Sequence, residues 1–190
     1  MRELDISGFK ESIIERSDYP IEQCKKILKD EVTAILGYGP QGRGQSLNMR
    51  DQGFDVIIGL RKGNSWDKAI LDGWEEGKTL FPINEAVEKA TIIQFLLSDA
   101  GQIQAWPEVK SRLKEGDALY FSHGFGVVFH QDTQIVPPDN IDVILVAPKG
   151  SGLTVRNHFK EGRGINASFA IHQDFTKKAK KRCIATAFAI

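Results

Sequence analysis

Residues 32–42 of this chain read Val-Thr-Ala-Ile-Leu-Gly-Tyr-Gly-Pro-Gln-Gly. A short apolar, β-prone run breaks into Gly-x-Gly-x-x-Gly, and the residues that follow continue as a helical segment. In this pattern Gly37 permits a tight turn, Gly39 lets a pyrophosphate approach the backbone, and Gly42 lets the helix pack closely on the strand. A second β-prone segment at 55–59 completes a strand–helix–strand unit. The stretch therefore predicts a dinucleotide site at the start of the helix.

The loop after the second strand differs from that of a typical NAD site. Such a site places Asp or Glu about 20 residues beyond the glycines, where it bonds a ribose hydroxyl. Here residues 60–65 read Leu-Arg-Lys-Gly-Asn-Ser, and no carboxylate occurs before Asp67. A guanidinium binds a phosphate bidentately, and an ammonium adds a point charge. We therefore predict a pocket for the 2′-phosphate of NADPH with Arg61, Lys62 and Ser65 as contacts; ordinary solvated loop charges are the alternative.

The composition limits the class of protein. A chain of 190 residues with 41% hydrophobic and 26% charged residues is typical of a globular domain. Basic and acidic residues total 25 each, which gives no indication of a nucleic acid or membrane partner. No apolar run approaches the ~20 residues that span a bilayer, and the N-terminus lacks a secretory signal. Cys24 and Cys183 have neither disulfide nor metal spacing, so we expect buried free thiols and a cytoplasmic location.

Strand-like and helix-like segments alternate along the chain. Residues 1–19 predict an extended arm with turns at Ser7-Gly8 and Ser17-Asp18, and residues 20–190 predict one Rossmann-like domain. The alternation indicates an α/β, doubly wound, mostly parallel sheet. The expected strands are 32–36, 55–59, 91–97, 118–121, 142–146 and 165–171, and the expected helices are 20–29, 41–52, 65–72, 85–89, 102–114 and 174–190.

In such sheets ligands bind beyond the carboxyl ends of the strands. That rule brings five loops to one crevice: 37–42, 60–65, 98–102, 122–126 and 148–152. Within the third loop, Asp99 is typical of a helix cap rather than of a catalytic acid. The three tryptophans, Trp66, Trp74 and Trp106, are interpreted as core or interface aromatics.

Two polar residues of these loops could carry chemistry. His123 follows a buried strand beside two glycines, where an imidazole could exchange protons or bind a carbonyl; a histidine hydrogen-bonded in a tight loop is the alternative. Lys149 follows the next strand and could hold an anionic substrate or a metal-bound carboxylate, or be a solvated loop lysine. The other histidines, His130, His158 and His172, are interpreted as structural or surface residues.

Five stretches together resemble the N-terminal domain of ketol-acid reductoisomerase, a family of branched-chain amino-acid biosynthesis. They are Leu-Gly-Tyr-Gly-Pro-Gln-Gly at 36–42, Gly-Leu-Arg-Lys-Gly at 59–63, Ser-His-Gly-Phe at 122–125, Val-Pro-Pro at 136–138 and Val-Ala-Pro-Lys at 146–149. The resemblance implies a reaction that depends on NADPH and Mg²⁺. An alkyl group of 2-acetolactate or 2-aceto-2-hydroxybutyrate migrates, and hydride reduction then gives a 2,3-dihydroxy acid.

The resemblance also implies roles for single residues. It makes His123 the active-site histidine and Lys149 the lysine near the metal cluster. The NADPH-contact positions that it implies are Gly37, Tyr38, Gly39, Pro40, Gln41, Arg61, Ser65, Ser98, Asp99, Gln102 and Gly152. In this family two Mg²⁺ ions are held mostly by carboxylates of a helical C-terminal domain that this chain lacks. We therefore expect the metal ligands outside this chain, a homo-oligomer in the full-length enzyme, and NADPH binding without turnover here.

The apolar segment 183–190 predicts a buried helix, interpreted as an interrupted chain or an interface. Two alternatives remain at this point. One is an NADP-linked dehydrogenase domain of the β-hydroxyacid type, which needs no alkyl migration. The other is a non-catalytic NADPH-binding module whose terminal helix docks on a partner.

Overall fold

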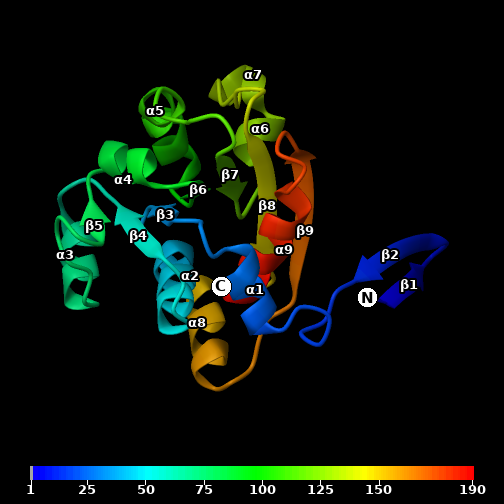
Figure 1. The fold of residues 1–190 in the computed structure, drawn as a ribbon. Coiled ribbons are helices and arrows are strands. Elements are labelled where there is room, and N and C mark those ends of the chain that lie inside the picture. The colour runs from blue at the N-terminus through cyan, green and yellow to red at the C-terminus, as the bar shows by residue number, and fades with distance from the viewer. Residues whose placement is uncertain (1) are drawn as a thin grey trace.

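The computed structural model describes residues 2–190, whose centre is a seven-stranded sheet (Figure 1). The strand order is β5-β4-β3-β6-β7-β8-β9, and among these strands β9 alone is antiparallel to its neighbour. The predicted α/β, mostly parallel, doubly wound class is thus confirmed. The strands are β3 (Thr33–Leu36), β4 (Val56–Gly59), β5 (Leu80–Phe81), β6 (Ile92–Phe95), β7 (Ala118–Phe121), β8 (Asp142–Pro148) and β9 (Ala167–Gln173).

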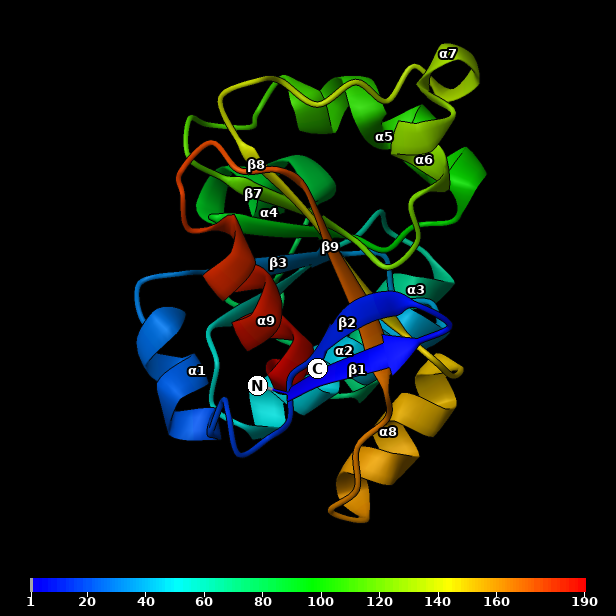
Figure 2. The same ribbon diagram turned by 90° about the vertical axis from the view of Figure 1, so that its right-hand side faces the viewer.

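Helices cover both faces of this sheet (Figure 2). Side chains of β3 alternate: Ala34 and Leu36 pack toward α4 (Ile83–Lys89) and α5 (Asp99–Lys110), and Ile35 packs toward α2 (Pro40–Asp51). Both faces are therefore apolar, as a parallel sheet requires. The helices are α1 (Ile21–Ile27), α2 (Pro40–Asp51), α3 (Asn64–Leu71), α4 (Ile83–Lys89), α5 (Asp99–Lys110), α6 (Phe125–Val128), α7 (His130–Thr133), α8 (Gly152–Lys160) and α9 (Ala179–Ala189).

The N-terminal arm is a β-hairpin that stands beside the domain (Figure 1). It comprises β1 (Arg2–Ile6) and β2 (Phe9–Ile13), paired antiparallel. The turn predicted at Ser7-Gly8 is confirmed: both residues have positive φ, and the Asp5 carboxylate accepts a hydrogen bond from the Gly8 N–H. The structure has a paired hairpin where the sequence predicted a single extended arm. The turn lets the backbone N–H and C=O groups of the two strands form hydrogen bonds with each other.

The helix after β6 begins earlier than expected. The Ser98 hydroxyl accepts a hydrogen bond from the Gly101 N–H, so Ser98 is the N-cap and α5 starts at Asp99 instead of residue 102. The prediction that Asp99 caps this helix is therefore wrong. The strand β5 and the helices α6, α7 and α8 were also absent from the sequence-based prediction.

The apolar terminal segment packs inside this domain. Helix α9 lies against α1, β8 and β9, and the Phe188 ring stacks on Tyr19 with centroids 6.1 Å apart. This packing accounts for the hydrophobicity of the segment, and the expected interruption or interface stays a prediction. The helix begins at Ala179, five residues later than predicted, and the Asp174 carboxylate accepts a hydrogen bond from the Ala179 N–H.

Other expectations about the core are confirmed. Cys24 and Cys183 are buried free thiols, and burial raises the pKa of Cys183 to about 12. The three tryptophans are 2–3% exposed. Among residues 2–190, no helix is long and apolar enough to cross a membrane.

Candidate functional site

The turn between β3 and α2 requires glycine at two positions. Gly37 has φ +104°, and a Cβ there would lie 2.7 Å from the Leu96 carbonyl oxygen. A Cβ on Gly42 would lie 2.1 Å from the Gly37 carbonyl oxygen. Both distances are far below van der Waals contact with backbone atoms that cannot move aside. The tight turn and the close helix–strand packing predicted for these glycines are confirmed.

Gly39 differs from those two glycines. Its φ of −71° suits any residue, and a Cβ there would meet no atom within 4 Å. It is also the N-cap of α2, and as a glycine it offers no side-chain hydrogen bond to the first turn of that helix. The N-terminus of α2 thus presents backbone N–H groups and a positive dipole end beside open space.

A cleft of about 220 Å³ opens beside this turn. It lies at the point where the strand order reverses, because β3 has β4 on one side and β6 on the other. In open α/β sheets, ligands bind at this point. Six predicted contact residues line the cleft together with Leu60, Ile83, Leu96 and Leu97; the six are Gly37, Tyr38, Gly39, Arg61, Ser65 and Ser98.

The two cations of the 60–65 loop have different surroundings. The Arg61 guanidinium lines the cleft and donates a hydrogen bond of 3.0 Å to the Gln104 side-chain oxygen on α5. Lys62 is not among the residues that line the cleft. Its ammonium lies 2.5 Å from the Glu76 carboxylate and 3.8 Å from the centroid of the Trp66 ring. The structure therefore brings Arg61 to the cleft and places Lys62 beside it.

Other predicted contact residues use their side chains to hold the loops. The buried Tyr38 hydroxyl donates to Asp72 and accepts from the Trp74 indole N–H, and burial raises its pKa. The Gln102 amide donates to the carbonyls of Phe95 and Leu97, at the end of β6. Tyr38 lines the cleft, whereas Gln102 is not among the residues that line it. Their contact with a cofactor stays a prediction.

A buried polar network beneath the site was missed by the sequence analysis. Gln45, fully buried on α2, donates from its amide to the Gln41 oxygen at 3.0 Å and the Ser122 hydroxyl at 3.1 Å. Gln41 in turn donates to the Gly150 carbonyl at 2.9 Å. The Tyr120 hydroxyl lies 3.1 Å from the Gln45 oxygen. These contacts connect the glycine turn to the loops after β7 and β8.

His123 lies on the loop after β7 with 61% of its side chain exposed. Its Nδ1 accepts a hydrogen bond from the Phe125 N–H, which leaves the proton of the neutral ring on Nε2. Nε2 lies 3.8 Å from the Asp99 carboxylate. Lys149 is exposed on the loop after β8, and none of the described contacts joins its ammonium to His123. Asp99 therefore lies close to His123, and the exposed Lys149 has no described contact with that ring.

The donor set around His123 does not fit a divalent-metal cluster. Mg²⁺ prefers an octahedral shell of oxygen ligands, in which carboxylates are joined by water and substrate. Asp99 is the one carboxylate described in contact with His123. Nowhere in residues 2–190 do three or more His, Cys, Asp or Glu side chains form a group that could hold a metal ion.

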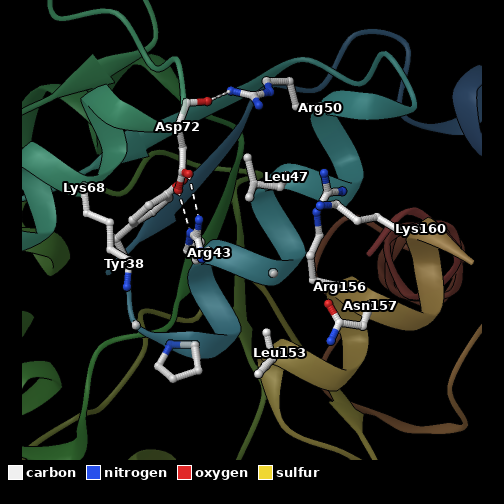
Figure 3. A pocket seen from close by; sticks show the side chains of 14 residues that line it. Tyr38, Arg43, Leu47, Arg50, Lys68, Asp72, Leu153, Arg156, Asn157 and Lys160 are labelled. Carbon is white, nitrogen blue, oxygen red and sulfur yellow. Dashed lines mark hydrogen bonds and ion pairs between the residues drawn. The ribbon is translucent and has the colours of Figure 1, made fainter.

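A larger cleft of about 470 Å³ lies between α2 and α8 (Figure 3). Asp72 is paired there with Arg43 through two hydrogen bonds of 2.6 and 2.8 Å, and the guanidinium lowers the pKa of this carboxyl. Predicted contact residues Tyr38, Gly39, Pro40 and Gly152 border this cleft too. This cleft was not predictable from the sequence, because one of its two walls is α8, a helix that was not predicted.

The fold, the uncapped helix after the glycine turn and the cleft at the switch point define a nicotinamide-dinucleotide-binding domain of the Rossmann type. The model of the family "Acetohydroxy acid isomeroreductase, NADPH-binding domain" matches residues 27–190. The chain belongs to this family. Family membership decides against the alternative of a β-hydroxyacid-type dehydrogenase.

Individual relatives agree with this assignment. "Ketol-acid reductoisomerase (NAD(+))" of Desulfosudis oleivorans is 54% identical over all of this chain and 54% of its own length. "Probable ketol-acid reductoisomerase, mitochondrial" of Schizosaccharomyces pombe is 56% identical over all of this chain and 47% of its length. A solved structure of an NADH-preferring ketol-acid reductoisomerase from an uncultured archean has TM-score 0.80 at 38% identity, covering 87% of this chain and 50% of that one. The chain spans about half the length of these relatives.

Proposed function

We propose that this chain is the NADPH-binding half of a ketol-acid reductoisomerase. The open space beside Gly39 is the observation that supports this proposal most directly. Neither its φ nor its surroundings in the chain require glycine, whereas a diphosphate at the N-terminus of α2 would need the space that a Cβ would fill. Gly37, Ser98 and Arg61 then surround the adenosine side of the cofactor in the 220 Å³ cleft.

The longer protein would convert 2-acetolactate and 2-aceto-2-hydroxybutyrate to 2,3-dihydroxy acids. NADPH supplies the hydride for that reduction. The His123 imidazole is exposed at the carboxyl end of β7, so it can exchange protons with a bound substrate, and the Asp99 carboxylate lies 3.8 Å from its Nε2. We assign Mg²⁺ ligands to residues outside this chain, and we propose a homo-oligomer in the cytoplasm. Lys149 would contribute charge toward the anionic substrate.

The preference for NADPH over NADH rests on Arg61 and Ser65. Both line the cleft, and no carboxylate precedes Asp67 in the loop to accept hydrogen bonds from a 2′-hydroxyl. Two of the relatives named above carry NAD(+) or NADH in their names, while the family model carries NADPH. The proposed preference for NADPH therefore rests on the residues of this chain's own 60–65 loop. Gln104 is a neutral partner for Arg61, so the guanidinium keeps its full charge for a phosphate.

Replacing Gly39 by alanine is expected to weaken NADPH binding while leaving the stability of the fold nearly unchanged. The free energy of unfolding should change by less than about 1 kcal/mol, because the new Cβ meets nothing in the protein. NADPH affinity, measured by cofactor fluorescence, should fall about tenfold or more, because overpacking costs roughly 1–3 kcal/mol. Gly42→Ala should instead lose stability and binding together. A Gly39→Ala protein that binds NADPH normally would contradict the proposed diphosphate position.

Replacing Arg61 by alanine tests the cofactor preference. A hydrogen bond to a charged group contributes about 1.5–3 kcal/mol, so NADPH should weaken roughly tenfold or more while NADH barely changes. Both dissociation constants are measured for the parent and variant at one ionic strength. Equal losses for the two cofactors would show that Arg61 contacts a part common to both, such as the adenine.

A further inference from the structure

Lys62 and Glu76 form a charge pair beside the cofactor loop. Lys62 follows Arg61 directly, and Glu76 comes from the segment between α3 and β5. The Lys62 ammonium is 2.5 Å from a Glu76 carboxylate oxygen and 3.8 Å from the Trp66 ring centroid. Trp66 is 2% exposed, so the ring is a fixed surface under the ammonium. Two partners from outside the loop thus hold the second cation of the loop in one place.

The partners of the two loop cations differ in charge. Gln104 is neutral and leaves the charge of Arg61 intact, whereas the carboxylate of Glu76 cancels that of Lys62. A dianionic phosphate that approaches this loop therefore meets one net positive charge instead of two. A cofactor without the 2′-phosphate carries its charge on the diphosphate, which the proposal places at the N-terminus of α2 and not at this loop, so the change affects its binding less.

We propose that Glu76 is a specificity-determining residue that weakens the preference of this chain for NADPH over NADH by neutralising Lys62. The inference rests on the proposed function, since it assumes that the 2′-phosphate approaches the 60–65 loop. Glu76 is a positioning residue in this scheme. It acts through the Lys62 side chain and touches no cofactor itself.

The chain contains a matched control at the adjacent position. Glu75 forms an equivalent exposed pair with Lys78 at 2.6 Å, but it does not contact Lys62. The substitutions Glu75→Gln and Glu76→Gln therefore change the net charge equally and remove one surface ion pair each. A difference between the two variants isolates the effect of releasing Lys62.

The experiment measures NADPH and NADH dissociation constants for the parent, Glu76→Gln, Glu75→Gln, Lys62→Gln and the double variant Lys62→Gln/Glu76→Gln. Glu76→Gln should tighten NADPH about threefold to tenfold at low salt, leave NADH within twofold, and lose its effect as salt rises. Glu75→Gln should change neither cofactor, and Glu76→Gln should have no effect when Lys62 is absent.

Three outcomes would overturn this inference. Equal tightening of NADPH binding in Glu75→Gln and Glu76→Gln would assign the effect to overall charge. Unchanged NADPH binding in Glu76→Gln would show that Glu76 has no role in cofactor preference. If Glu76→Gln still tightened NADPH binding in the Lys62→Gln background, Glu76 would not act through Lys62. Failure of the proposed function is distinguishable. In that case the parent binds neither cofactor, or Arg61→Ala weakens both cofactors equally.

Discussion

Replacing Gly152 by alanine is expected to lower the free energy of unfolding by about 3 kcal/mol or more and to abolish measurable NADPH binding. Gly152 is the first residue of α8, and a Cβ there would lie 1.8 Å from the carbonyl oxygen of Pro40 and 2.4 Å from the Gln41 nitrogen. Overpacking of a core typically costs 1–3 kcal/mol, and here the obstructing atoms are backbone. Relief requires α8 to move away from the first turn of α2, where the proposed diphosphate binds.

Urea unfolding and NADPH titration of the same preparation check this prediction. The matched control is Gly124→Ala, because Gly124 also stands at the start of a helix, as the N-cap of α6, has φ −88°, and would place its Cβ 3.6 Å or more from its neighbours. The control should stay within about 1 kcal/mol of the parent in stability. A Gly152→Ala variant as stable as that control would mean that the two helix starts are not tightly packed.

The glycine turn and its two strands were predictable because their signals are local. The apolar run into β3, the positive φ at Gly37 and the helix that follows all depend on residues close in sequence. Helix α8 escaped prediction because Gly152 continues a glycine-rich loop, and Val155 is the one large apolar residue that the helix buries. Its position is set by packing on α2, which a one-dimensional pattern does not contain.

The candidate site was predictable where its signals are local in sequence and not where they depend on packing. Arg61 and Ser65 were found because their distance from the glycines fixes their place at the end of β4. Lys62 was predicted as a third contact, and its ion pair with Glu76 was not predictable, because Glu76 is 14 residues away and only the folded chain brings the two side chains together. The sequence shows which side chains carry a positive charge that could bind a phosphate. Only the fold shows which of these charges are already paired with a carboxylate.

Replacing Gln45 by leucine is expected to have the second large effect. A glutamine on a helix is usually interpreted as a solvent-facing residue, but this one is fully buried. Leucine fills a similar volume and leaves the Gln41 oxygen and the Ser122 hydroxyl without their donor. A buried polar group left unpaired costs about 1–3 kcal/mol, and Gln41 and Ser122 are half-buried, so stability should fall by roughly 1–3 kcal/mol. NADPH should bind more weakly, because Gln41 belongs to the turn that holds it.

A double-mutant cycle with Tyr120→Phe measures whether the network acts as a unit. The Tyr120 hydroxyl bonds both the Gln45 oxygen and the Val146 carbonyl, so it joins α2 to β8 through β7. Removing both partners of a hydrogen bond costs less than the two single losses combined, and we expect a coupling energy of about 0.5–3 kcal/mol in urea unfolding. Additive losses would mean that these groups stabilise the protein independently. A measured coupling would instead show that the cofactor turn and the loop of His123 are held in register by one buried amide.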